Sequence, residues 1–112
     1  MLAIIGRKHT KLNDSEMSPK RKGDFAEHYV ITWLWDQGYE VFKNSGSDGI
    51  VDMVAWNTSE NKTILIDVKT FQTTKRSDWG GCSRTDRQKE LNVRLVGFDP
   101  VTRKAWWVEH RQ

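Results

Sequence analysis

The chain has 112 residues, of which 29% are charged and 37% are hydrophobic, and its formal net charge is +3. This balance predicts one soluble globular domain, with no apolar run long enough to cross a membrane and no sign of a small-molecule cofactor. The single cysteine, Cys82, excludes an internal disulfide framework and a cysteine-based zinc site, and it favours the cytoplasm as the compartment.

Residues 1–17 are weakly patterned and are expected to form a partly flexible segment before a single domain at 18–112. The domain is predicted to open with a helix ending at residue 37, because Ser18 suits the N-cap, Pro19 the first helical position and Gly38 the position beyond the end. Apolar residues recur along this helix at helical spacing and predict its core-facing stripe: Phe25, Ala26, Tyr29, Val30, Trp33 and Leu34.

Five later segments are rich in β-branched and apolar residues and are predicted to be strands: 39–43, 50–56, 63–69, 94–98 and 105–108. A polar turn at 57–62 joins the second and third strands into a hairpin. The loop 71–83 leads to a short helix at 84–92, for which Ser83 and Thr85 are alternative caps. The order helix, three strands, helix, two strands predicts an α/β fold with a mixed central sheet flanked by helices.

The predicted hairpin brings two aspartates together. If its turn is centred between Ser59 and Glu60, Asp52 lies opposite Asp67, with Cβ atoms about 5 Å apart. Like charges at this distance repel, and a carboxylate in an apolar strand is unfavourable without compensation. Lys69 provides one positive charge, but a divalent cation on the carboxylate oxygens compensates better. A one-residue slip in register would turn one aspartate to the other face.

Glu27 lies at the edge of the apolar stripe of the first helix, where it has two interpretations of equal weight. Asp24 and Glu27 have the spacing of a capping box, which would give Glu27 a structural role. The stronger helix start at Ser18 instead places Glu27 well inside the helix, where it can point toward the sheet. Glu27 would then be a third acid beside Asp52 and Asp67.

Three acids and a lysine permit metal-dependent hydrolysis of a phosphodiester. Asp52 and Asp67 would ligate Mg²⁺, the carbonyl of Val68 could add a ligand, and Glu27 would ligate directly or through water. Lys69 would orient the attacking water or offset the growing charge on the phosphate.

Basic side chains cluster in sequence near these acids, which is compatible with nucleic acid as a partner. The loop at 44–49 is rich in serine and glycine, and its hydroxyls could bind water or phosphate. The candidate DNA-binding residues are Lys20, Arg21, Lys22, Ser45, Ser47, Lys75, Arg76, Arg84, Arg87 and Gln88.

The set Glu27, Asp52 and Asp67-Val68-Lys69 resembles the PD-(D/E)xK nuclease superfamily over residues 20–98. Two segments are similar to archaeal-type and phage Holliday junction resolvases. One is Lys22-Gly23 followed by Glu27, and the other is the serine- and glycine-rich stretch 45–52 that leads to the second acid. Gln88 matches a polar position on the second helix of several branches. Two departures are Val51 in place of the proline that names the motif, and Asp67 where glutamate is commoner.

The resemblance implies a restriction-endonuclease-like αβββαβ core and DNA cleavage that depends on Mg²⁺, with Mn²⁺ as a substitute. It also implies branched DNA as the substrate and a homodimer as the assembly. The superfamily includes repair and restriction nucleases that act on other DNA structures, so these are alternatives. A DNA-binding module without catalysis, and a plain basic domain whose acids form salt bridges, are two further alternatives.

Overall fold

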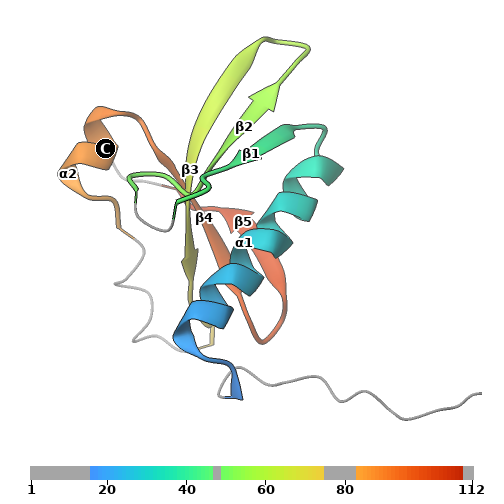
Figure 1. Cartoon of the computed structure of the whole chain (residues 1–112), viewed down its shortest axis with the longest axis vertical. Coiled ribbons are helices and arrows are strands. Elements are labelled where there is room, and N and C mark those ends of the chain that lie inside the picture. The colour runs from blue at the N-terminus through green and yellow to red at the C-terminus, as the bar shows by residue number, and fades with distance from the viewer. Residues whose placement is uncertain (1–15, 47–48, 75–82, 110–112) are drawn as a thin grey trace, which may run out of the picture.

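The computed structural model describes residues 16–46, 49–74 and 83–109 (Figure 1). Its elements follow in the order α1 (Pro19–Asp36), β1 (Glu40–Lys43), β2 (Met53–Asn57), β3 (Lys62–Thr70), α2 (Asp86–Glu90), β4 (Arg94–Asp99) and β5 (Lys104–Trp107). The five strands form one sheet in sequence order, with β3 and β4 parallel and the other neighbours antiparallel. Most of the N-terminal segment 1–17 lies outside the described residues. Within the described ranges, no helix has the length and apolar character needed to cross a membrane.

The two helices flank the mixed sheet, with α1 packed across one face and α2 on the other side (Figure 1). This arrangement confirms the predicted α/β fold. Three residues of the predicted stripe of α1 are completely enclosed, namely Ala26, Val30 and Leu34. They pack against the side chains that the sheet presents to this helix, among them Met53, Ala55, Ile66, Val96 and Phe98.

Both predicted ends of α1 are confirmed within a residue. The Ser18 hydroxyl accepts a hydrogen bond from the Arg21 amide at 3.2 Å, as an N-cap does. The last helical residue is Asp36 rather than Gln37, which is the C-cap. Gly38 has a φ of +90°, a backbone conformation that residues with a side chain rarely adopt.

The hairpin has the predicted register, since Met53 pairs with Ile66 and Asn57 with Lys62. The ladder ends at Met53, and the same register continued by one residue would set Asp52 opposite Asp67. The predicted start of this strand at residue 50 is wrong, because β2 begins at Met53. The carbonyl of Ile50 accepts its hydrogen bond from a side chain of α2 instead of from a neighbouring strand.

Helix α2 is shorter than the predicted 84–92. Thr85 is its N-cap and forms a capping box, in which Gln88 Oε1 accepts a hydrogen bond from the Thr85 amide at 3.0 Å. The helix stops because Leu91 is the C-cap and Asn92 has a φ of 56°. Strand β4 extends one residue further than predicted and ends with Asp99, whose side chain is 1% exposed.

Asp99 connects the segment after β3 to the turn between β4 and β5. Its carboxylate accepts hydrogen bonds from the Thr73 amide and hydroxyl and from the Val101 and Thr102 amides, at 2.8 to 3.3 Å. Burial acts to raise the pKa of Asp99, but the hydrogen bonds from Thr73, Val101 and Thr102 outweigh it and hold the pKa below its ordinary value.

Asp99→Asn should therefore destabilise the fold by roughly 1–3 kcal/mol, because an amide group turned toward these donors leaves some of them without a partner. The depressed pKa means that the contribution of Asp99 is present at neutral pH and is lost as the pH falls through the folded-state pKa. Urea unfolding at pH 7 and at pH 3 measures both effects. A variant as stable as wild type at pH 7 would contradict this assignment.

Candidate active site

Asp52 and Asp67 lie at the point where the pairing of β2 with β3 ends. Strand β2 begins at Met53, whereas β3 continues to Thr70 and pairs there with β4 alone. The Asp52 amide still donates to the Ile66 carbonyl at 2.8 Å, and its Oδ2 accepts from the Val68 amide at 2.7 Å. The carboxylate of Asp52 thus accepts the hydrogen bond of a β3 amide that a neighbouring strand would otherwise accept.

Asp67 contacts Lys69 and Gln88 in addition to Asp52. Its Oδ2 lies 3.3 Å from Lys69 Nζ and accepts a hydrogen bond from Gln88 Nε2 at 3.1 Å. The Asp67 side chain is only 14% exposed, while that of Lys69 is 40% exposed. Lys69 therefore forms an ion pair with a largely buried carboxylate while its own side chain stays partly exposed to solvent.

The carboxyl of Asp52 is difficult to ionise in this environment. Burial raises its pKa to about 7, and the neighbouring Asp67 adds to the effect by hydrogen bonding and by repulsion. The negative charge of Glu27 acts in the same direction, and the Val68 amide opposes it. A cation bound beside the two carboxylates would favour the ionised form of Asp52, which is the role expected of the predicted metal ion.

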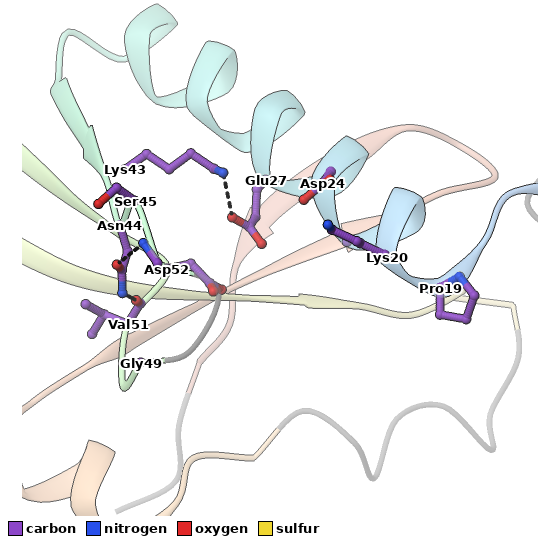
Figure 2. Close-up of a pocket in the computed structure, with 12 residues that line it drawn as sticks. Pro19, Lys20, Asp24, Glu27, Lys43, Asn44, Ser45, Gly49, Val51 and Asp52 are labelled. Atoms are coloured by element: carbon purple, nitrogen blue, oxygen red, sulfur yellow. Dashed lines mark hydrogen bonds and ion pairs between the residues drawn. The ribbon is translucent and has the colours of Figure 1, made fainter.

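Glu27 lies in the third turn of α1 and is not part of a capping box at the helix start, which Ser18 caps. Its Oε1 lies 3.7 Å from Lys43 Nζ, and its side chain is 23% exposed. Figure 2 shows Glu27 extending from α1 toward Lys43 and Asp52. Within the described ranges, no three or more His, Cys, Asp or Glu side chains are close enough together to hold one metal ion. The three-acid ligand set remains a prediction.

Gln88 is buried at 6% exposure and links three parts of the site. Its Nε2 donates to Asp67 and, at 2.9 Å, to the Ile50 carbonyl, while its Oε1 accepts from the Thr85 amide. The side chain therefore faces the acid pair rather than solvent, and its predicted contact with DNA stays a prediction.

A pocket of about 360 Å³ opens beside Asp52, on the side of α1 (Figure 2). Of the predicted DNA-binding residues, Lys20 and Ser45 line it. Sequence reasoning missed two other lining residues, Lys43 and Asn44. Their only signal was their position, at the end of a strand and immediately before the serine- and glycine-rich loop.

The remaining predicted DNA-binding residues have varied positions. Arg21 lines a separate hollow on α1, and Lys22 is half-buried. Arg84 donates to the Val93 carbonyl at 3.2 Å, and Arg87 pairs with Glu90 at 3.0 Å, so neither is joined to the acid pair. Three others lie outside the described residues: Ser47, Lys75 and Arg76.

Comparison with known proteins gives a relationship at the level of the fold. No protein-family model matches the chain, and no curated protein does. A solved structure of similar fold is that of a bacterial homing endonuclease, I-Ssp6803I, with a TM-score of 0.57 and 18% sequence identity. The similarity covers 81% of this chain and 64% of the homing endonuclease, so the chain spans less than two thirds of that protein. The predicted restriction-endonuclease-like αβββαβ core is confirmed.

Proposed function

We propose that this chain is a metal-dependent DNA endonuclease that hydrolyses phosphodiester bonds. The observation that carries the proposal is the pair Asp52 and Asp67 at the point where β2 stops pairing with β3, with Lys69 in an ion pair with Asp67. A likeness in fold to a homing endonuclease supports the same reaction class. The predicted resemblance to PD-(D/E)xK nucleases rests on these same residues.

The side chains at this position fit a hard divalent cation. Asp52 and Asp67 offer carboxylate oxygens, and the pKa of Asp52 is raised by burial and, to a smaller extent, by the neighbouring Asp67 and Glu27. These two acids would hold Mg²⁺ or Mn²⁺, with the Val68 carbonyl and Glu27 as further ligands. When bound, the ion would supply charge neutralisation at the phosphate and a more acidic water.

The protein's own groups have separable roles in this proposal. Lys69, which is partly exposed beside Asp67, would orient the attacking water or offset charge on the phosphate. Gln88 and the Val68 amide would fix the orientation of the two acids through the hydrogen bonds that they donate.

For the substrate, we propose branched DNA, with a homodimer making paired cuts. The support is the similarity of Lys22-Gly23 and Glu27 to the opening of Holliday junction resolvases. In the structure, Gly23 and Glu27 both line the pocket beside Asp52. A dimer suits this substrate because two symmetric incisions require two sites related by symmetry.

Cleavage of labelled DNAs in Mg²⁺ or Mn²⁺ tests the proposal, with linear duplex, single strand, flap, fork and four-way junction in one panel. We expect paired nicks in the four-way junction. Cutting of flaps or plain duplex instead would retain the nuclease and reject the preference for junctions. Binding without cutting of any substrate would favour the catalytically silent DNA-binding module.

A further inference from the structure

The pocket beside Asp52 is lined partly by residues that the proposed catalysis does not use, among them Lys20, Lys43 and Asn44. Its lining comes from the first turns of α1, the end of β1 and the loop that leads to Asp52. Asp67 is not among its lining residues. A volume of about 360 Å³ lies within the range of small-ligand sites and is ample for a phosphate with its sugar.

Two lysines face this pocket from different elements. Lys43 ends β1, where backbone pairing with Met53 holds it, and Lys20 lies in the first turn of α1. Figure 2 shows their amino groups pointing into the space around Glu27 from opposite sides. The contact from Lys43 to Glu27 is 3.7 Å, which is longer than a hydrogen bond, and the lysine side chain is 38% exposed. Its ammonium group therefore has donors for a ligand.

The acids that line the pocket leave the ammonium groups of Lys20 and Lys43 exposed to solvent. Asp52 accepts a hydrogen bond from the Val68 amide through its Oδ2, at 2.7 Å. The lining holds three acids, Asp24, Glu27 and Asp52, beside the two lysines. Lys20 and Lys43 are both exposed, and the contact of Lys43 with Glu27 is as long as 3.7 Å, so both ammonium groups stay accessible to a ligand.

The loop wall of the pocket is held in place by Asn44. Its Nδ2 donates to the Val51 carbonyl at 3.1 Å and its Oδ1 accepts from the Gly46 amide at 3.0 Å. A Cβ at Gly49 would lie 2.5 Å from Asn44 Nδ2, so a larger residue there would displace the Asn44 amide group. These two hydrogen bonds hold Asn44 in place, and the neighbouring Ser45 lines the pocket.

We propose that this pocket binds one backbone phosphate of the DNA strand beside the bond that is cut, with Lys43 and Lys20 as its two positive ligands. The inference rests on the proposed function in taking DNA as the ligand. A lysine acts on phosphate as a point charge and does not read the base, so this contact would position the strand for any sequence.

The first test measures DNA binding in EDTA by fluorescence anisotropy, so that no cleavage occurs. Lys43→Gln and Lys20→Gln should each weaken binding several-fold and lower the slope of log affinity against log salt by about 1. Lys62→Gln is the matched control, because Lys62 is also a terminal residue of a strand, the first of β3, and also pairs with a glutamate, at 3.5 Å from Glu60. A loss for Lys43→Gln no larger than that for Lys62→Gln would overturn the proposal.

The second test removes the charge from the DNA. A neutral methylphosphonate is placed at each position of one strand in turn, and binding is compared for wild type and Lys43→Gln. One position should weaken wild-type binding about as much as Lys43→Gln does, and it should have no effect in the variant. Equal losses in both proteins at every position would show that Lys43 contacts no phosphate.

Further controls distinguish phosphate binding in this pocket from the proposed nuclease activity. Lys43→Arg should keep the interference pattern, because it keeps the charge, and thermal melting checks that each variant is folded. Wild type that binds DNA with the expected pattern but cuts none would overturn the proposed function alone. Cleavage with an interference pattern that Lys43→Gln does not change would overturn this inference alone. Tighter binding of a free nucleotide than of DNA would also overturn it.

Discussion

Lys69→Ala and Asp67→Asn should each lower the rate of DNA cleavage about 10²- to 10³-fold while DNA binding is largely kept. Lys69 lies 3.3 Å from Asp67 and is the nearest described cation to the acid pair. Loss of the lysine removes a group that acts as charge develops on the phosphate. Loss of the carboxylate removes a metal ligand, so both changes should act on kcat more than on KM.

The comparison needs a lysine on the same strand that has no place in the chemistry. Lys62 begins β3 and pairs with Glu60, and its side chain is 75% exposed. Lys62→Ala should cut DNA at the wild-type rate in single-turnover assays. Equal losses in Lys62→Ala and Lys69→Ala would mean that charge on β3, rather than position beside Asp67, governs cleavage, and the assignment of Lys69 would fail.

Local chemistry was sufficient to predict most of the fold. Ser18 and Gly38 marked the ends of α1 because capping and positive φ depend on a few adjacent residues. The register of the hairpin followed from the position of its polar turn, and the two aspartates beyond its last pair, Asp52 and Asp67, have side chains in contact. The start of β2 could not be predicted, since it depends on a hydrogen bond from Gln88 to Ile50, 38 residues earlier in the chain.

The site shows the same division between local and long-range information. Asp67 and Lys69 share one face of a strand because side chains alternate, so their contact was predictable from spacing. The pairing of Lys43 with Glu27 was not, because it depends on how α1 crosses the end of β1. Likewise, Gln88 was predicted to contact DNA, but tertiary packing buries it against Asp67.

Asp52→Asn should stabilise the metal-free protein at neutral and alkaline pH. The folded-state pKa of Asp52 is raised from 3.8 to about 7, so the fold prefers the protonated acid. Ionisation therefore causes no destabilisation below about pH 4, and the destabilisation grows as the pH rises through 7. The variant removes this charge, and its amide oxygen can still accept from Val68. We expect a gain on the order of 2 kcal/mol at pH 8, after allowing for screening by solvent.

Thermal melts in EDTA at pH 4 and pH 8 measure this effect, with Asp99→Asn as the paired control of opposite sign. Asp52→Asn should match wild type at pH 4 and melt several degrees higher at pH 8. Excess Mg²⁺ should remove the advantage, because wild type has the better ligand. A basic domain whose acids form salt bridges predicts the reverse at pH 8. Clear destabilisation at pH 8 would contradict the claim that ionised Asp52 beside Asp67 destabilises the metal-free fold, and this claim supports the proposed metal site.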